Sequence, residues 1–233
     1  MQDMRKALVV EYQARRRHAS HPGRRAMTLW ARGATVFAVA LALSACGPGP
    51  DGTAGDGIRG TAFEPPLEKP DFVLTDLDGQ PFDFRTETEG LLTLLFFGYT
   101  NCPDVCPVHM GNLGAVISKY PFETRDRIRV IFVTTDPIRD TPERMRLWLN
   151  TFGGDIIGLR GDLEEVNRIQ AEMGLPPALL PDSVVTGVDY PVGHSARVIA
   201  FTPDNMGRVA YPFGTRQEDW VHDLPLLLSQ RGW

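Results

Sequence analysis

Residues 91–107 read LLTLLFFGYTNCPDVCP, an apolar run followed by two cysteines. The run up to Gly98 is continuously apolar, as expected of a strand that is buried on both faces of a sheet. Cys102 and Cys106 follow, and Pro107 favours the first turn of a helix, where a missing backbone N–H is tolerated. Thiols near a helix N-terminus are stabilised as thiolates, which are both nucleophiles and metal ligands. The sequence therefore predicts a redox or metal centre between a buried strand and a helix.

The remaining pattern predicts an α/β fold. Strands are expected over about residues 72–74, 82–84, 91–98, 128–133, 156–159, 197–202 and 208–213, and helices from about residues 107, 141, 162 and 215. The first two strands flank Asp78-Gly79 and should form a hairpin. This order implies a mixed central sheet with helices on both faces. The long Pro/Gly-containing loop 175–193 is of a kind that is often functional.

The N-terminus has the features of an export signal. Residues 1–45 hold a basic region and a short apolar run that ends in LSA, and Cys46 follows directly. This pattern predicts a bacterial lipoprotein signal peptide, with Cys46 as the lipidated residue. An uncleaved N-terminal anchor is the alternative, although the apolar run is too short to span a bilayer comfortably. A start at Met27 would give a signal of more ordinary length. In each case the rest of the chain is expected to be exported and tethered to the membrane.

Residues 46–62 are rich in Gly, Pro and Asp and are expected to form a flexible tether. Residues 63–233 are long enough for one domain with a full core. Of the 24 Lys/Arg and 29 Asp/Glu, residues 1–45 hold eight and two, so the remainder carries 16 and 27, a net charge of −11. Such acidity argues against nucleic-acid binding. The negative charge would suit a partner with a basic surface. The alternative is that it only reflects a solvent-exposed surface.

The two cysteines allow more than one interpretation. Export removes the usual reason for thiols to stay reduced, so a structural disulfide between Cys102 and Cys106 is one of them. A loop this short would stabilise the fold little, and a domain of this size does not need the bond. Reactive thiols, used either for exchange or as ligands of a soft metal, fit the helix N-terminus better.

Histidines offer a third ligand. His194 ends the long loop just before a predicted strand. In a thioredoxin-like sheet the start of that strand lies beside the cysteine loop, so the imidazole would reach both sulfurs. The alternative is an ordinary hydrogen-bonded loop histidine. His109 is the rival, because it follows Cys106 by three residues and shares its helical face. His222 is expected on the surface of the last helix.

Two thiolates and one imidazole form a soft ligand set of low coordination number. Such a set favours Cu(I), and accepts Cu(II) with one further weak ligand. Structural zinc needs four protein ligands, and the sequence offers no convincing fourth. Asp136 ends the second central strand, on the side where the cysteine loop emerges. It is expected either to accept a hydrogen bond or a proton near the thiols, or to be a turn residue before Pro137.

These pieces together resemble the Sco/SenC family of thioredoxin-fold copper proteins. The matching segments are FFGYTNCPDVCP, VTTDPIRDTPERM, GLRGDLEEVNRI and YPVGHSARVIAFTPDNMGRV, within about residues 63–230. The resemblance implies a thioredoxin-like mixed sheet with flanking helices and an added N-terminal β-hairpin.

The resemblance also implies the site residues. It implies copper ligation by Cys102, Cys106 and His194, and it matches Asp136 to the family's aspartate before proline. Gly193 departs from the Asp that is common before the metal histidine. His109 stands where another polar residue is usual, so a modified site is a further possibility.

The implied function is assembly of the binuclear copper site of cytochrome c oxidase. Members of the family deliver copper to that site, reduce its cysteines, or do both. The expected cargo is Cu(I) and/or Cu(II). The expected partners are the copper-site subunit of the oxidase, a periplasmic copper donor or thiol reductant, and the membrane through the lipid anchor. This makes the protein a metallochaperone, with thiol-disulfide reductase activity as an additional role. Cu(I) binding needs the reduced dithiol, and oxidation releases the metal.

Three other functions fit parts of the sequence. A thiol-disulfide oxidoreductase without physiological metal would not need His194. A peroxiredoxin-like peroxidase is weakly suggested by the sequence Thr100-Asn101-Cys102, one residue short of the peroxidatic spacing. A protein-binding module with structural cysteines would keep its partner after both cysteines are replaced.

Overall fold

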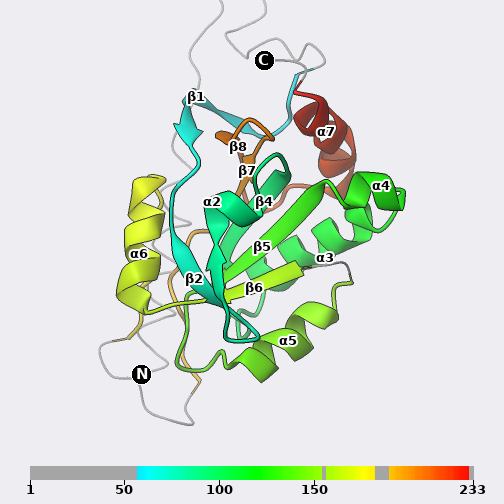
Figure 1. Ribbon diagram of the computed structural model, residues 1–233. Coiled ribbons are helices and arrows are strands. Elements are labelled where there is room, and N and C mark those ends of the chain that lie inside the picture. The colour runs from blue at the N-terminus through cyan, green and yellow to red at the C-terminus, as the bar shows by residue number, and fades with distance from the viewer. Residues whose placement is uncertain (1–56, 154–155, 182–188, 231–233) are drawn as a thin grey trace, which may run out of the picture. The chain divides into compact units, whose positions relative to one another are not determined.

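The computed structural model describes residues 57–153, 156–181 and 189–230 (Figure 1). These residues belong to a compact unit that spans Ala54–Trp233. The expected signal peptide, the lipidated Cys46 and most of the expected tether lie outside the described residues. Within the described part, no helix combines the length and apolarity that a membrane span requires.

One mixed sheet forms the centre of this unit. In the described residues its strand order is β1-β8-β7-β4-β5-β6-β2-β3. The strands are β1 (Thr61–Glu68), β2 (Val73–Asp76), β3 (Pro81–Asp83), β4 (Leu92–Gly98), β5 (Ile128–Thr134), β6 (Ile156–Arg160), β7 (Val198–Phe201) and β8 (Met206–Tyr211). Strand β4 pairs in parallel with β5 and antiparallel with β7. The mixed α/β fold predicted from the sequence is confirmed, including the β2–β3 hairpin.

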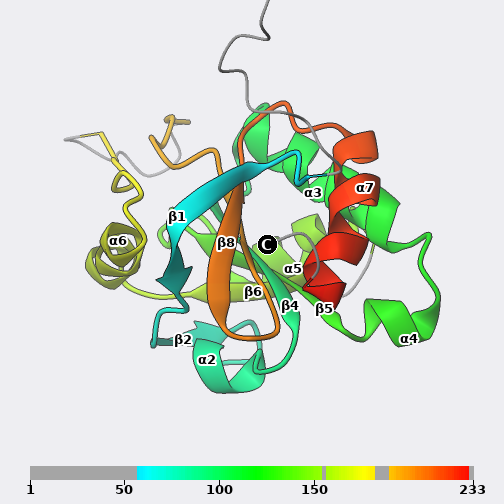
Figure 2. The ribbon, with the colours of Figure 1, turned by 90° about the horizontal axis from the view of Figure 1, so that it is seen from above.

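Helices cover both faces of the sheet (Figures 1 and 2). They are α2 (Phe84–Glu87), α3 (Val105–Ile117), α4 (Phe122–Arg125), α5 (Pro142–Asn150), α6 (Leu163–Glu172) and α7 (Gln217–Ser229). On one face, Leu94 and Phe96 of β4 join a core with residues of α3, α5 and α7. On the other face, Leu95 and Phe97 join a core with residues of α2 and α6. Alternate residues of β4 thus enter two cores, which explains why its sequence is continuously apolar.

Strand β1 was not expected. Thr61 and Ala62, assigned from the sequence to the end of the tether, already pair with Ala210 and Val209 of β8. Pro65 and Pro66 interrupt the strand pattern of this segment, and the pairing register shifts between Ala62 and Leu67. An edge strand tolerates proline because one side of it has no ladder to complete.

Asp223 of α7 fixes the point at which the chain enters the domain. Its fully buried carboxylate accepts hydrogen bonds from the backbone N–H groups of Arg59 and Gly60, at 2.9 and 3.1 Å. It also accepts one from the hydroxyl of Tyr211 at 2.8 Å. His222 contacts the same carboxylate, with Nδ1 2.7 Å from Oδ1. The contacts of the domain therefore include Arg59 and Gly60, a few residues before Phe63.

Candidate metal centre

The two cysteines lie between the end of β4 and the first turn of α3. The backbone N–H of Cys102 donates to the carbonyl of Tyr99 at 3.2 Å, which closes a turn after the strand. Helix α3 begins at Val105, so Cys106 is its second residue. The sequence placed the helix start at Pro107, two residues too late. A proline in the first turn does not interrupt a helix, because the first N–H groups have no intrahelical acceptor.

The first turn of the helix brings the thiols together. The backbone N–H of Cys106 donates to Sγ of Cys102 at 3.4 Å. Cys106 is fully buried, and Cys102 is 8% exposed. Both are free thiols in this structure. Cys102 is therefore the sulfur that a partner reaches first.

His194 completes the group from a separate segment. Its Nε2 lies 3.7 Å from Sγ of Cys102 and 3.6 Å from Sγ of Cys106. Its Nδ1 lies 2.8 Å from the carbonyl oxygen of Ser195. A carbonyl can only accept, so Nδ1 carries the proton and Nε2 presents its lone pair to the sulfurs. The edge-on rings of Tyr99 and Phe96 hold the imidazole, with centroids 5.5 and 6.0 Å away.

These three side chains form the group suited to a metal in the described part of the chain. Their ligand atoms all lie within 4.8 Å of one another. The structure thus brings together the three residues that the sequence nominated. Two sulfurs and one imidazole nitrogen match the ligand preference of copper better than that of zinc, which usually takes four protein ligands.

The two thiols differ electrostatically. Hydrogen bonds lower the pKa of Cys102 to about 4, chiefly the bond with the Cys106 thiol, with a further contribution from backbone N–H groups. Burial is the main cause that raises the pKa of Cys106, and the neighbouring Cys102 thiolate raises it further. The reduced pair therefore carries one thiolate, on Cys102, and one thiol, on Cys106.

Gly98 is a site residue that sequence reasoning missed. A Cβ atom at this position would lie 2.7 Å from Sγ of Cys106 and 2.8 Å from the ring of Phe96. A side chain here would displace the sulfur, so glycine makes the space that Cys106 occupies. A glycine at the end of an otherwise apolar strand signals such a close approach.

His109 is not one of the three grouped side chains. It is 1% exposed, and its Nε2 lies 3.1 Å from the carbonyl oxygen of Ala196. Its ring packs against Phe96 and Phe213. Burial lowers the pKa of this imidazole. His109 therefore supports the loop that carries His194, and Nε2 is already engaged.

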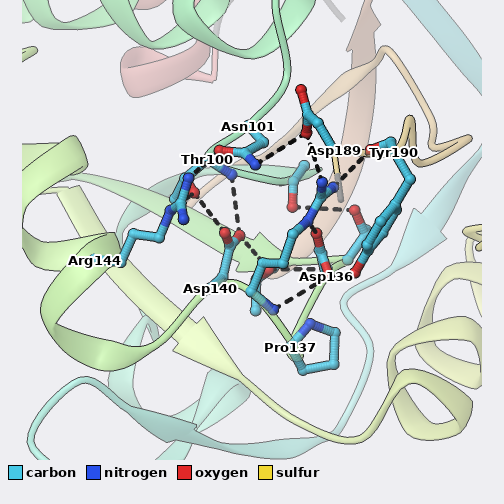
Figure 3. A network of polar contacts seen from close by, with 12 residues as sticks. Thr100, Asn101, Asp136, Pro137, Asp140, Arg144, Asp189 and Tyr190 are labelled. Carbon is cyan, nitrogen blue, oxygen red and sulfur yellow. Dashed lines mark hydrogen bonds and ion pairs between the residues drawn. The ribbon is translucent and has the colours of Figure 1, made fainter. Parts of the chain in front are cut away.

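Asp136 lies in a different environment from the one expected near the thiols. Its carboxylate accepts from the hydroxyl of Tyr190 at 2.9 Å and pairs closely with Nε of Arg139 (Figure 3). Among the described residues it has no hydrogen bond to either sulfur or to His194.

Asp140 is the carboxylate that holds the cysteine loop. It accepts from the backbone N–H and the hydroxyl of Thr100, at 3.0 and 2.5 Å, and from the hydroxyl of Thr134 at 2.6 Å (Figure 3). Burial raises the pKa of Asp140. The sequence contains both aspartates in DPIRD, but it does not show which one faces the loop.

The fold and the site together define a thioredoxin-like protein with a dithiol and a histidine in metal-ligand geometry. The SCO1/SenC family model matches residues 61–229. The chain belongs to the SCO1/SenC family.

Relatives and solved structures agree with this assignment. The mitochondrial protein SCO2 of Saccharomyces cerevisiae is 32% identical over 133 residues, which cover 57% of this chain and 44% of the relative. The first curated relatives are covered over less than two thirds of their length.

The crystal structure of yeast Sco1 with copper bound has a TM-score of 0.62 and 28% identity, over 71% of this chain and 90% of that one. The solution structure of apo Sco1 from Thermus thermophilus has a TM-score of 0.65 and 30% identity, over 76% and 100%. The thioredoxin-like fold expected from the sequence is thereby confirmed.

Proposed function

We propose that this protein binds copper through Cys102, Cys106 and His194 and serves in assembly of the binuclear copper site of cytochrome c oxidase. The observation that carries the proposal is the convergence of two sulfurs and one nitrogen within 4.8 Å. Similar solved structures, yeast Sco1 and ScoI of Bradyrhizobium japonicum, contain copper. Soft thiolates select Cu(I), and the imidazole supplies the ligand that also admits Cu(II).

The protein works outside the cytoplasm, tethered to the membrane through a lipidated Cys46. The support for this location is the signal-like segment 1–45 and the Gly/Pro/Asp-rich segment that follows it. A tether lets the domain reach a membrane-bound oxidase subunit while it stays at the same surface. An upstream copper donor or thiol reductant reloads it. The net charge of −11 beyond residue 45 suits partners with basic surfaces.

Two activities use the same side chains. As a donor, the protein passes copper from its two thiolates to the cysteines of the target. As a reductant, the Cys102 thiolate attacks one sulfur of a target disulfide and releases the other target thiolate. Cys106 loses its proton and attacks Sγ of Cys102, which frees the second target thiol. The protein dithiol loses two electrons and the target disulfide gains them.

A thiol-disulfide oxidoreductase without physiological metal is the second candidate. The observation in its favour is the split between the thiols, with a low pKa at the more accessible Cys102. His194 separates the two functions. Dithiol exchange needs no third ligand, whereas copper transfer does.

The test uses a soluble copper-site fragment of an oxidase subunit as the target. In one reaction, protein loaded with Cu(I) meets the reduced fragment without oxygen. In the other, copper-free reduced protein meets the fragment with its two cysteines oxidised. The proposal predicts that His194→Ala impairs copper transfer and leaves reduction of the fragment nearly intact. Failure of the wild-type protein to transfer copper, together with rapid reduction of the fragment, would favour the oxidoreductase.

A further inference from the structure

The three candidate ligands come from two independent segments. Cys102 and Cys106 share one turn at the start of α3, and a backbone-to-sulfur hydrogen bond already joins them. His194 stands on the long connection between α6 and β7, beyond residues 182–188, which the structure does not describe. Near it, the described backbone bonds pair Gly193 with Leu179, at 2.8 and 3.0 Å. The dithiol is thus assembled locally, whereas the histidine depends on how its loop is docked.

Arg139 contacts the part of the loop that precedes His194 and joins it to the rest of the domain. Its Nη1 donates to the carboxylate of Asp189 and its Nη2 donates to the carbonyl of Tyr190, both at 2.8 Å. Its Nε pairs with Asp136. The guanidinium carbon also lies 3.5 Å from the centre of the Tyr190 ring. The planar guanidinium thus holds the loop that carries His194 by two hydrogen bonds and by stacking on Tyr190. A lysine side chain cannot make this combination of contacts.

Asp136 and Arg139 form a largely buried ion pair beneath the loop. The Arg139 side chain is 13% exposed and that of Asp136 is fully buried, so the pair is shielded from water. The hydroxyl of Tyr190 donates to the other oxygen of Asp136 at 2.9 Å, which closes a ring of three side chains. The backbone N–H of Asp136 donates to the hydroxyl of Thr134 at the end of β5, at 3.0 Å. The loop is therefore anchored to the central sheet.

The same cluster reaches the cysteine loop. Asn101 donates its side-chain N–H to Asp189 at 3.3 Å (Figure 3). The guanidinium of Arg139 lies 5.7 Å from the ring centre of Tyr99, and that ring packs against His194. Arg139 consequently has contacts with both of the segments that supply ligands.

We propose that Arg139 is the positioning residue of the metal centre, which holds the His194 loop against the cysteine turn so that the imidazole reaches both sulfurs. This proposal rests on the copper-binding function proposed above. It also assigns Asp136 an indirect role, as the anchor of Arg139 rather than as a group that acts on the thiols.

The proposal has a selective consequence for the two oxidation states of copper. Two thiolates supply most of the affinity for Cu(I), and both belong to the α3 turn. Cu(II) prefers more ligands and harder ones, so it depends on the imidazole. Loosening the loop should therefore weaken Cu(II) binding far more than Cu(I) binding. The equilibrium between dithiol and disulfide should hardly change, because neither cysteine is on that loop.

The experiment compares the full-length wild-type protein with Arg139→Gln, His194→Ala and the double variant. Cu(I) and Cu(II) affinities are measured by competition with chelators, and nitrogen hyperfine coupling in the Cu(II) EPR spectrum reports the imidazole. Arg139→Gln should lower Cu(II) affinity about tenfold or more and weaken that coupling, while Cu(I) affinity falls much less. Retained Cu(I) binding shows that the variant is folded.

A double-mutant cycle tests whether Arg139 acts through the histidine. In the His194→Ala background, Arg139→Gln should cost almost nothing further in Cu(II) affinity. Asp136→Asn should reproduce the Arg139→Gln effect without altering thiol reactivity. The matched control is Arg168→Gln, which removes an exposed arginine that pairs with Glu165 and Glu172 on α6.

Three results would overturn the proposal. These are unchanged Cu(II) affinity and nitrogen coupling in Arg139→Gln, additive losses in the double variant, and equal losses of Cu(I) and Cu(II). If the wild-type protein binds no copper, or if His194→Ala binds it as tightly as wild type, the proposed function itself fails. That outcome is distinct from a failure of Arg139→Gln alone.

Discussion

Gly98 makes room for Cys106: a Cβ atom on the glycine would lie 2.7 Å from the cysteine Sγ. The same Cβ would lie 3.1 Å from the ring of Phe132, so the surrounding core leaves no free direction. The last residue of β4 thereby fixes where one of the two sulfurs stands.

Gly98→Ala should therefore damage the metal centre more than the fold. The added methyl group displaces Sγ of Cys106, and we expect Cu(I) affinity to fall about tenfold or more. The measurement is a chelator competition on the reduced protein. Gly111→Ala is the matched control on α3, because its Cβ would meet Phe152 at an ordinary 3.9 Å. Equal copper affinity in the two variants would contradict this account of Gly98.

The split between the thiols predicts selective alkylation. In the reduced, copper-free protein, Cys102 has a pKa of about 4 and is 8% exposed, whereas Cys106 has a raised pKa and is fully buried. At pH 6, iodoacetamide should modify Cys102 about threefold faster than an ordinary thiol, because the larger thiolate fraction outweighs the lower nucleophilicity of a low-pKa thiolate. The rate should fall only as the pH approaches 4.

Peptide mapping by mass spectrometry reads out the two sites separately. Faster labelling of Cys106, or a Cys102 rate that rises tenfold per pH unit up to pH 8, would show that the assignment of the thiolate is wrong.

Much of the site could be predicted because it is encoded locally. The apolar run of β4, the two cysteines and Pro107 are consecutive, so their order alone places a thiol turn between strand and helix. His194 could be nominated because strand β7 begins soon after it and pairs with β4. Because β7 lies next to β4 in the sheet, the histidine before β7 lies close to the cysteines after β4.

Other features depend on side-chain packing, which a sequence pattern does not specify. Asp136 and Asp140 are four residues apart, and only the directions of their side chains decide that Asp140 holds Thr100 while Asp136 holds Arg139. Strand β1 was not predicted because its two prolines are atypical of a strand. Its strand conformation depends on pairing with β8. The start of α3 was placed late because a proline fits any position of the first turn.

Lys69 gives a prediction about stability and pH. Its side chain is buried, with Nζ 2.9 Å from the carbonyl of Thr88 and 2.8 Å from the hydroxyl of the same residue. Burial lowers its pKa from 10.5 to about 8. Between these values the unfolded chain binds more protons than the folded one, so the free energy of unfolding rises with pH. The cost of the buried charge is fully present below pH 8 and disappears above 10.5.

Lys69→Met removes this dependence. Urea unfolding at pH 7 and 9 should show the wild-type protein gaining about 1 kcal/mol relative to the variant over this interval. Parallel pH profiles for the two proteins would mean that Lys69 titrates as it does in the unfolded chain.

Asp223 is expected to be a stability residue remote from the chemistry. Asp223→Asn leaves one acceptor oxygen where two oxygens now accept from Arg59, Gly60 and Tyr211. Loss of part of this partly buried hydrogen-bond set should lower the free energy of unfolding by about 1–2 kcal/mol, with copper affinity unchanged. Asp126→Asn is the control, since the Asp126 side chain is 63% exposed and pairs with Arg129 at 3.6 Å. If Asp223→Asn lowers the free energy of unfolding less than Asp126→Asn does, the hydrogen bonds of Asp223 contribute little to stability.

The proposed copper site is made by two cysteines from one turn and a histidine from another loop. The most direct measurement is an anaerobic titration of the reduced protein with Cu(I) against a competing chelator, for wild type, Cys102→Ser and His194→Ala. We predict tight one-to-one binding by the wild-type protein, its collapse in Cys102→Ser, and a clear weakening in His194→Ala. Weak wild-type binding, or binding indifferent to both substitutions, would contradict the three-ligand site and leave dithiol exchange as the function.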